Sequence, residues 1–396
     1  MNLHIFLSSI ESETRLFKET QYTIQEGVFD RIGVCGLWRE GLETFELLSW
    51  GLEVYRKKTY LSSHRDWLLS PKAKFLRKLF AMFSLIQYAI FILQKSLKFR
   101  PTHITCHNSM LLPLSWLAAK FSGALLIYTP HELETERTHL KGLQKRIEKV
   151  SERVFISSCA EVVVVCEPIA NWYVTRYKLK NVWTIRNLPK TLDVSIKNKD
   201  RNLLRKIFKI PADSLVIIYQ GIFGPARGTS ELLKIFSSVE CKEIHLVLMG
   251  LGDESDVLEI KSHVDKYSNI HFQPAVPMKD IVSYTASADI GIFISDITSL
   301  SYRYALPNKF FEYLHGGLPV IVSGNLEYLS GIVMGNQLGW VSQFSDVKDT
   351  VVSIQPSEVE TFKNKVVDYA KDAVWETDAI QYKKIYKSFV KQERSK

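Results

Sequence analysis

The side chains best suited to chemistry stand in residues 305–324, ALPNKFFEYLHGGLPVIVSG, where polar residues are set into a short apolar helix. With Pro307 as the first helical residue, Asn308, Lys309 and Glu312 fall on one face, opposite the aromatic residues. That face begins at a helix N-terminus, which favours an anion, and Lys309 adds charge for a phosphate. Glu312 can accept two hydrogen bonds from a sugar diol, so the order matches a nucleoside diphosphate. The alternative is a solvated Lys–Glu pair on an exposed helix.

Two glycine turns in the same half of the chain favour the first interpretation. In IIYQGIFGPARG, Gly221 and Gly224 follow a predicted strand, and Arg227 and Gly228 stand at the start of the next helix. Glycine lets the backbone approach a diphosphate closely. Gly250 ends another strand in LVLMGLGD, where it leaves room for a base or a ribose. Neither turn has the spacing of a known phosphate-binding motif, and ordinary turns are the alternative for both.

Polar residues also follow two predicted strands in the first half of the chain. His131 and Glu132 come directly after a strand in LIYTPHELETE, and His107 and Asn108 end the strand in ITCHN. A histidine beside a carboxylate can transfer a proton or bind a sugar hydroxyl. We therefore expect a reactive pair at His131 and Glu132, with His107 and Asn108 on the acceptor side. The alternative is a loop histidine that caps the following helix.

The elements that must position these residues are short apolar strands alternating with helices. Such strands are typical of a parallel sheet covered on both faces. The first series is LHIFLSS, RIGVCGL, THITCHN, ALLIYTPH, EVVVVCE and NVWTIRN, and the second is SLVIIYQG, EIHLVLMGLGD, NIHFQPAV, ADIGIFIS and LPVIVSG. We therefore predict an α/β fold of two doubly wound domains with a ligand cleft between them.

A polar stretch, TLDVSIKNKDRN, separates the two series and has little apolar surface to bury. We place a first Rossmann-like, acceptor-side domain at residues 1–190 and a second, nucleotide-binding Rossmann-like domain at 191–370. Residues 371–396 have apolar residues at helical spacing, and we expect a terminal helix that packs back on the first domain.

Length and composition agree with two domains. At 396 residues, with 46% hydrophobic and 23% charged residues, the chain can bury sizeable cores. The net charge of +9 is spread along the chain and favours an anionic partner such as phosphate or a lipid surface. The cysteines are dispersed and odd in number, which predicts buried cytosolic thiols. They are Cys35, Cys106, Cys159, Cys166 and Cys241.

One stretch does not fit the alternating scheme. Residues 71–100, PKAKFLRKLFAMFSLIQYAIFILQKSLKFR, predict a long apolar helix with basic residues at both ends. Its uninterrupted apolar part is a little short for a membrane span. A buried domain helix, an interfacial helix and a true span are the alternatives. Basic ends beside aromatic and aliphatic residues suit an anionic bilayer surface, so we expect membrane contact here.

These motifs together resemble the GT-B glycosyltransferases close to family 4, the retaining nucleotide-sugar transferases of polysaccharide and lipid-linked glycan synthesis. YRYALPNKFFEYLHGGLPVIVSG is similar to that family's Pro-Asn-Lys-x-x-Glu-Tyr helix, followed by Gly-x-Pro-Val-Ile. YTPHELETE resembles its strand-end His-Glu segment, TIRNLPK the segment that closes its first domain, and YQGIFGPARGTSELL its phosphate turn. The resemblance implies a GT-B fold, two Rossmann-like domains facing across a cleft, with a C-terminal helix.

The resemblance also implies roles for individual residues. Glu312 is expected to hold the donor ribose, Arg227 the diphosphate, and Lys309 a second phosphate position. His131 is expected to lie near the transferred sugar. We accordingly take His131, Glu132, Arg227 and Lys309 as the catalytic residues.

Two positions depart from the family's pattern. The family often has a second glutamate eight positions before the first, near the donor sugar, and here Tyr304 stands there. Tyr304 is kept as a donor-binding residue. Many members have a basic residue in the phosphate turn where this chain has Gly224. A retaining reaction needs no protein base, because the donor phosphate can guide the acceptor proton, whereas an inverting reaction would use His131 or Glu132.

The function we expect is a glycosyltransferase of the hexosyltransferase type, acting in surface polysaccharide synthesis. It would move a sugar from a UDP- or GDP-sugar to a glycan or lipid-linked acceptor. We expect no nucleic acid partner. No Asp-x-Asp stands in a plausible position, so we expect no metal. We expect a cytoplasmic protein, peripheral on the inner face of the cytoplasmic membrane. The alternatives are a GT-B-fold nucleotide-sugar epimerase or hydrolase, and a degenerate, non-catalytic transferase that acts as a binding partner.

Overall fold

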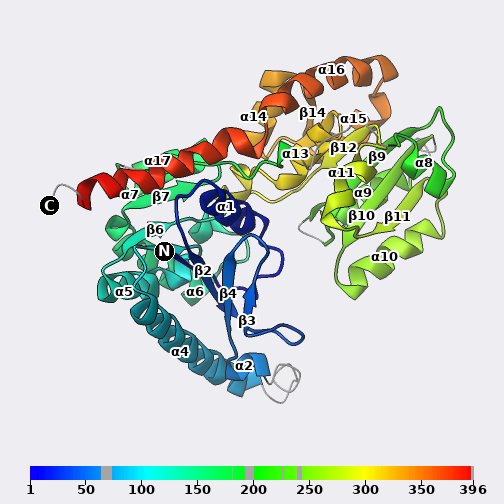
Figure 1. Ribbon diagram of the computed structural model, residues 1–396. Coiled ribbons are helices and arrows are strands. Elements are labelled where there is room, and N and C mark those ends of the chain that lie inside the picture. The colour runs from blue at the N-terminus through cyan, green and yellow to red at the C-terminus, as the bar shows by residue number, and fades with distance from the viewer. Residues whose placement is uncertain (64–73, 181, 192–199, 225–226, 239–242, 394–396) are drawn as a thin grey trace. The chain divides into compact units, whose positions relative to one another are not determined.

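The fold is described from a computed structural model (Figure 1). It describes residues 1–396 except 64–73, 181, 192–199, 225–226, 239–242 and 394–396. Cys241, most of the polar stretch between the two strand series and the first residues of 71–100 lie outside the described residues. The chain divides into two compact units, Met1–Ile185 with Ala379–Lys396, and Arg186–Asp378. Each unit is described by itself below.

The first unit is built on an eight-stranded sheet in the order β3-β4-β2-β1-β5-β6-β7-β8. All neighbours are parallel except β3, which runs antiparallel to β4. The strands are β1 (Asn2–Ile5), β2 (Ile32–Leu37), β3 (Phe45–Leu47), β4 (Leu52–Lys57), β5 (His103–Cys106), β6 (Leu125–Tyr128), β7 (Glu161–Val164) and β8 (Val182–Thr184). The chain winds outward from β1 in both directions, so the topological switch point lies between β1 and β5.

The crossover helices of this unit connect those parallel strands. They are α1 (Thr14–Gln25), α2 (Tyr60–Ser63), α4 (Lys74–Phe99), α5 (Leu112–Ser122), α6 (Gly142–Phe155) and α7 (Glu167–Tyr177), with short 3-10 turns at Ser109–Leu111, Glu134–Glu136 and Ile156–Ser158. The strands β1, β5 and β7 are buried along their whole length, because helices cover a parallel sheet on both faces.

The long helix predicted at 71–100 is α4, which leads into β5 (α4 is teal in Figure 1). From Leu79 on, its buried side chains recur every fourth position: Ser84, Tyr88, Ile92 and Ser96. The Tyr88 hydroxyl lies 2.7 Å from the carbonyl oxygens of Phe6 and of Cys35, and this contact fixes the helix to the sheet. One stripe is therefore buried, and α4 is not a fully buried helix.

Much of the remaining surface of α4 is apolar and exposed. Exposed large side chains along it are Leu79, Met82, Phe83, Leu85, Ile86, Ile90 and Leu97. Among the described residues, Leu79–Phe99 is the one helical stretch whose length and composition would let it cross a membrane, with a mean hydropathy of 1.4. A small cavity of about 300 Å³ opens between α4 and the start of α5, lined by Met82, Ile86, Met110 and Leu114 among others.

The second unit repeats the doubly wound plan with a six-stranded parallel sheet in the order β11-β10-β9-β12-β13-β14. The strands are β9 (Leu215–Ile222), β10 (Ile244–Leu251), β11 (Ile270–Pro274), β12 (Ile290–Phe293), β13 (Val320–Ser323) and β14 (Gly339–Ser342). The helices are α8 (Leu203–Phe208), α9 (Thr229–Phe236), α10 (Glu254–Val264), α11 (Ile281–Thr285), α12 (Leu300–Arg303), α13 (Asn308–His315), α14 (Glu327–Asn336), α15 (Val347–Ser353) and α16 (Pro356–Asp372), with 3-10 turns at Met278–Asp280 and Phe344–Asp346. The order of the strands reverses between β9 and β12, which is the switch point of this sheet.

The last helix, α17 (Trp375–Glu393), begins in the second unit and continues in the first. Within the first unit, the hydroxyls of Tyr382 and Tyr386 donate to the buried carboxylate of Glu19 on α1. Burial raises the pKa of Glu19, while these tyrosine hydrogen bonds and the positive charge of Arg15 lower it. The terminal helix is thus tied to the first unit by buried polar contacts as well as by apolar packing.

The predicted α/β class, with two doubly wound parallel sheets and a C-terminal helix, is confirmed. Three strands were not predicted: β3, β4 and β14. One helix boundary was also wrong by a residue, because Pro307 has an extended backbone with ψ of 145° and serves as the N-cap. Helix α13 therefore begins at Asn308.

Candidate functional site

The residues predicted to bind a nucleotide gather at the switch point of the second unit. Lys309, in the first turn of α13, lies with its Nζ 4.2 Å from the ring centre of Tyr219 on β9 and 4.7 Å from that of Phe293 on β12. The same Nζ would lie 3.1 Å from a Cβ built on Gly221. Ligands of open α/β sheets bind at this place, outside the carboxyl ends of the strands. Lys309 is therefore not the solvated residue of an exposed helix face.

The surroundings of Lys309 weaken its positive charge. Burial, and then the neighbouring guanidinium of Arg227, lower the pKa of Lys309 to about 7, while Glu312 acts in the opposite direction. Two cationic side chains held near each other repel, and an anion placed between them would relieve that repulsion. The pair formed by Arg227 and Lys309 thus has the electrostatics of an anion site.

Glu312, one turn further along α13, is held by a chain of side chains. Its carboxylate accepts a hydrogen bond from the amide of Gln220, whose own oxygen accepts one from the hydroxyl of Thr285 at 2.6 Å. The backbone N–H of Gln220 donates to the hydroxyl of Tyr313 at 3.0 Å. These contacts fix the rotamer of Glu312 at the end of β9, so the carboxylate is oriented before any ligand arrives.

The phosphate turn is closed by its own hydrogen bonds. The N–H of Gly224 donates to the hydroxyl of Thr229 at 3.0 Å, and the N–H of Arg227 donates to the carbonyl of Gly224 at 2.9 Å. Gly228, the N-cap of α9, has a φ of 72°, and a Cβ there would lie 2.7 Å from the carbonyl oxygen of Ile294. Glycine is required at this position both by its backbone and by its neighbour.

Gly250 has a different reason for being glycine from the one predicted. It pairs with Gly221 across β10 and β9, and a Cβ on Gly250 would lie 1.8 Å from the carbonyl oxygen of Gly221. The close approach is therefore between two strands.

Two further predicted residues lie in or just before α13 in the sequence. Asn308 accepts a hydrogen bond from the Asn187 amide at 2.8 Å, and Tyr304 ends the short helix α12 in a half-buried position.

The first-unit residues meet at the other switch point. His107 follows β5 and His131 follows β6, and because these strands are parallel neighbours, the two rings lie together. Nδ1 of His107 is 3.0 Å from Nε2 of His131. On its other side, Nε2 of His107 is 2.9 Å from Nδ1 of His4 on β1. His107, at 1% exposure, has both ring nitrogens engaged and stands behind His131.

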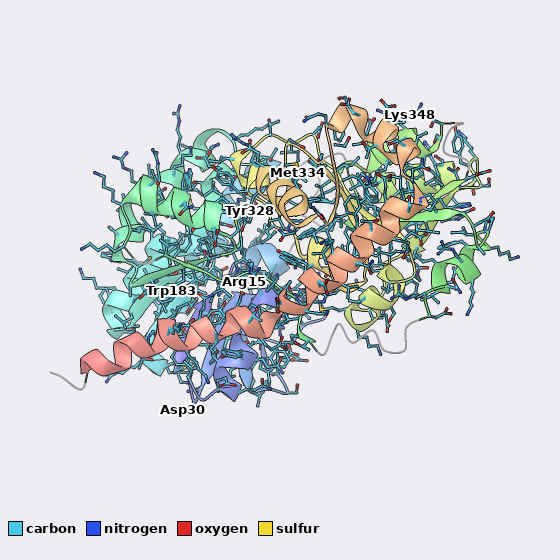
Figure 2. All side chains as sticks on the ribbon, turned by 90° about the horizontal axis from the view of Figure 1, so that it is seen from above. Arg15, Asp30, Trp183, Tyr328, Met334 and Lys348 are labelled. Atoms are coloured by element: carbon cyan, nitrogen blue, oxygen red, sulfur yellow. The ribbon has the colours of Figure 1, made fainter. Side chains whose placement is uncertain are left out.

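All three imidazoles are neutral at physiological pH. Burial lowers the pKa of His4 and of His131 to about 3, and the pKa of His107 lies well below its usual range for the same main reason. The positive charge of Arg15, on α1, contributes for His107 and His131 (Figure 2). A neutral histidine carries one N–H and one lone pair, so each ring is both a donor and an acceptor.

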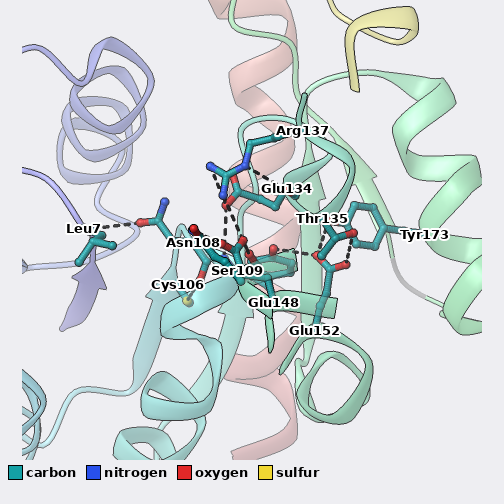
Figure 3. Close-up of polar contacts among 12 residues, drawn as sticks. Leu7, Cys106, Asn108, Ser109, Glu134, Thr135, Arg137, Glu148, Glu152 and Tyr173 are labelled. Carbon is teal, nitrogen blue, oxygen red and sulfur yellow. Dashed lines mark hydrogen bonds and ion pairs between the residues drawn. The ribbon is translucent and has the colours of Figure 1, made fainter. Parts of the chain in front are cut away.

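The loop that carries His131 is fixed by two buried carboxylates of α6 (Figure 3). Glu152 accepts hydrogen bonds from four hydroxyls, of which that of Thr135 belongs to this loop. Glu148 accepts from the hydroxyl of Ser109 at 2.6 Å and from Arg137 at 3.0 Å. Since Tyr128, before the loop, and Thr135 and Arg137, after His131, all bind carboxylates of one helix, His131 has a defined position at the strand end.

The other predicted residues of this unit have mixed surroundings. Asn108 uses its side-chain oxygen to accept from the N–H of Leu7 at 3.0 Å, so it ties two strand-end loops together. Glu132 is half-buried. Glu134 was not predicted, yet it is the buried carboxylate of this loop. Burial raises its pKa to about 8, against the lowering effect of Arg137.

Sequence reasoning missed several partners of the predicted residues. Gln220, Thr285 and Tyr219 shape the site of the second unit, and His4 and Arg15 that of the first. Of these residues, Gln220 could have been found from the sequence, because it stands directly before Gly221. Among the described residues, no group of three or more His, Cys, Asp or Glu side chains is arranged to hold a metal ion.

Solved structures share this fold along the whole chain. Sucrose-phosphate synthase from Thermosynechococcus elongatus matches with a TM-score of 0.76 at 15% identity, covering 99% of each chain. HepE from Anabaena, solved with UDP-glucose, matches with a TM-score of 0.67 at 14% identity, covering 100% of this chain and 99% of that one. WaaG, a glycosyltransferase involved in lipopolysaccharide biosynthesis, matches with a TM-score of 0.69 at 13% identity, covering 98% and 99%. At these identities the likeness concerns the fold.

Sequence comparison adds the family. Residues 51–188 match the model described as Glycosyltransferase Family 4, and residues 200–365 match the model described as Glycosyl transferases group 1. The two matches follow the order of the two units and together cover well over half of the chain. No curated protein sequence matches the chain. The chain belongs to the GT-B glycosyltransferases of group 1, close to family 4.

Proposed function

We propose that this glycosyltransferase moves a hexose from a nucleotide diphosphate sugar to a glycan or lipid-linked acceptor during surface polysaccharide synthesis. The observation that carries the proposal is the cluster of Lys309, Arg227 and the N-terminus of α13 at the end of β9, with Glu312 one turn away. Cations followed by an oriented carboxylate match a diphosphate followed by a ribose. UDP is the first nucleotide to test, because HepE was solved with UDP-glucose.

In this reaction the bond between the anomeric carbon and the diphosphate oxygen breaks, and a bond from that carbon to the acceptor oxygen forms. Negative charge develops on the departing diphosphate, where Arg227 and Lys309 would stabilise it. We propose that no metal is needed for that stabilisation. We also propose retention of configuration, since a phosphate oxygen of the leaving group can take the acceptor proton and no protein base is then required.

Features of the first unit support a membrane-bound acceptor. Helix α4 exposes an apolar surface in addition to its buried stripe, and α6 exposes a second stripe at helical spacing: Leu143, Ile147, Val150 and Val154. Basic residues lie between those of α6, namely Lys145, Arg146, Lys149 and Arg153. Apolar stripes flanked by basic residues are typical of helices that lie in an anionic bilayer surface. We therefore propose a peripheral protein on the cytoplasmic face of the membrane.

Thermal unfolding with UDP, GDP and their common sugars tests the donor site. A nucleotide present at 100 times its Kd should add about 2.7 kcal/mol to the free energy of unfolding. We expect one nucleotide to stabilise the protein, and Glu312→Ala to lose most of that shift. Glu360→Ala is the matched control, because Glu360 lies on the surface of α16 in the same unit and pairs with Lys363. No shift with any nucleotide, or an equal shift in Glu312→Ala, would count against the proposed donor site.

Turnover then separates transfer from the alternative reactions. With the stabilising nucleotide sugar, a transferase consumes donor in proportion to an added lipid-linked acceptor. An epimerase or hydrolase consumes it without acceptor. A non-catalytic binding partner binds the donor but never consumes it, and that result would overturn the transferase proposal.

A further inference from the structure

Two buried histidines of the first unit, His4 and His107, and the half-buried His131 form one hydrogen-bonded chain that ends at Asn2. The Asn2 Nδ2 is 3.0 Å from Nε2 of His4, Nδ1 of His4 is 2.9 Å from Nε2 of His107, and Nδ1 of His107 is 3.0 Å from Nε2 of His131. Both contacts between rings thus join the same pair of atoms, Nδ1 of one ring to Nε2 of the next. The far end, Nδ1 of His131, has no hydrogen-bond partner among the described residues.

The orientation of the Asn2 amide gives this chain a direction. The Tyr386 hydroxyl donates its proton to Glu19 at 2.8 Å, so its lone pairs are available to the Asn2 NH₂, which is 3.4 Å away. On the opposite side of the amide, the Thr105 hydroxyl donates to the Asn2 oxygen at 3.1 Å. The NH₂ group therefore faces His4 and can only donate to it.

A neutral imidazole that accepts at Nε2 must carry its proton on Nδ1. His4 consequently donates from Nδ1 to His107, and His107 in turn donates from Nδ1 to His131. We propose that Asn2 is a positioning residue that fixes the tautomers of all three histidines, so that His131 presents Nδ1–H as a hydrogen-bond donor. In this state His131 binds a ligand hydroxyl or carbonyl oxygen and does not accept a proton from it.

This inference rests on the proposed function in one respect, the place of His131 beside the transferred sugar. It also bears on that function, because it removes His131 as a base for an inverting reaction. The charged groups near the chain act in the same direction. Arg15 disfavours an extra proton on His107 and His131, and Glu19 is occupied by the two tyrosine hydroxyls of α17.

Nitrogen-15 NMR of the full-length protein labelled in its histidine rings tests the proposal directly. A ring nitrogen that carries a proton has a different chemical shift from one that does not. At pH 7.5 we expect His4, His107 and His131 all to be Nδ1–H tautomers. In Asn2→Asp the new carboxylate accepts from His4, so the chain should reverse and His131 should become an Nε2–H tautomer. The His245–His271 pair of the second unit is an internal control, because its contact lies outside this chain and its signals should not move.

A second variant covers the case in which Asn2→Asp does not fold. In Asn2→Leu the leucine side chain has a similar shape but no N–H to donate to His4, so His131 should be a mixture of both tautomers. We expect about a tenfold or larger fall in kcat for Asn2→Asp and a smaller fall for Asn2→Leu, with the thermal shift caused by UDP unchanged in both. Nε2–H tautomers in the wild type, or pure Nδ1–H signals in both variants, would overturn the proposal. The UDP shift reports the donor site alone, so failure of the proposed function would be seen separately.

Discussion

Lys309 is the residue whose chemistry should respond most to the donor. In the free protein its pKa is about 7, so at pH 8 most molecules carry a neutral amine. A bound diphosphate favours the charged form, which raises the pKa and draws a proton from the buffer. We therefore predict net proton uptake when UDP binds at pH 8, approaching one proton per site. Calorimetric titration in buffers of different ionisation enthalpy measures this uptake.

Lys309→Met is the variant that assigns the proton. It removes the titrating group and keeps an apolar stem over the rings of Tyr219 and Phe293. Binding should weaken, and its enthalpy should no longer depend on the buffer. A buffer dependence equal to that of the wild type would mean that the proton goes to another group.

At the scale of residues, the position of a side chain could be predicted where residues close in the sequence determine it. The 3.6-residue period alone brought Lys309 and Glu312 to one face of α13, and the structure has both at the switch point of the sheet. Prediction from sequence failed for partners that only the tertiary fold supplies. Gln220 and Thr285 are 65 positions apart in sequence, and His4 lies inside a buried strand where it looks like any core residue.

At the scale of elements, the carboxyl end of β9 needs a glycine for two reasons, its backbone conformation and the space beside it. Gly221 has a φ of 125°, and a Cβ there would come within 3.1 Å of Lys309 Nζ. We predict that Gly221→Ala weakens UDP binding about tenfold and lowers the free energy of unfolding by about 1–2 kcal/mol, because the alanine strains the backbone and displaces Lys309. Titration with UDP and urea unfolding measure the two effects.

Gly123→Ala is the matched control for that strain. Gly123, the C-cap of α5, has a φ of 74° with open space around the position of a Cβ. The control should lose stability by a similar amount and bind UDP normally. Equal UDP affinity in both variants would contradict the contact between Gly221 and Lys309.

Helix α4 gives a second prediction at this scale. Ile86 and Ile90 are 50% and 51% exposed on one side of the helix, so glutamate at both positions should leave the fold intact. We predict that Ile86→Glu with Ile90→Glu reduces binding to phosphatidylcholine vesicles containing phosphatidylglycerol at least tenfold, because the helix loses buried apolar area and gains repulsion. Sedimentation with the vesicles measures the bound fraction.

A single apolar-to-acidic change elsewhere controls for the effect of an added surface carboxylate on solubility. Leu258, on α10 of the second unit, is 59% exposed, and Leu258→Glu should not affect vesicle binding. If wild type and all variants bind the vesicles equally, or none binds, α4 is not the membrane contact. The salt dependence of vesicle binding by the wild type would separate the contribution of the basic residues from that of the apolar residues.

Elements differ in how well their sequence revealed them. Strands such as β9 and β10, which have long apolar runs with a glycine near the end, were predicted. The missed strands differ from these. β3 has three residues with both phenylalanine and leucine exposed, charged residues interrupt β4 (LEVYRK), and β14 is half-buried over most of its length. None of the three has the apolar run on which a strand prediction relies.

At the scale of the whole molecule, buried histidines and buried carboxylates have opposite effects on how the free energy of unfolding changes with pH. A histidine whose pKa falls on folding makes the unfolded state bind more protons between the folded pKa and 6.5, so stability falls as the pH falls. Glu134 has the opposite sign. Its pKa rises from 4.5 to about 8, so the folded state holds the extra proton and gains stability on acidification through that range.

Histidines with a lowered pKa outnumber carboxylates with a raised pKa among the described residues, which gives the last prediction its sign. The histidines are His4, His103, His107, His131, His245 and His271, and the carboxylates are Glu19, Glu134, Glu152 and Glu161. His4, His107 and His131 each contribute up to about 1.4 kcal/mol per pH unit below pH 6.5, and Glu134 offsets about one of the three. We predict that the free energy of unfolding, measured with urea, falls by about 2 kcal/mol or more between pH 6.5 and 5. Glu134→Gln removes the opposing contribution, so its decline should be steeper than that of the wild type. A stability that is flat or rises towards pH 5 would mean that the histidine chain takes up protons without unfolding, and it would contradict the neutral chain on which the direction of the His131 N–H depends.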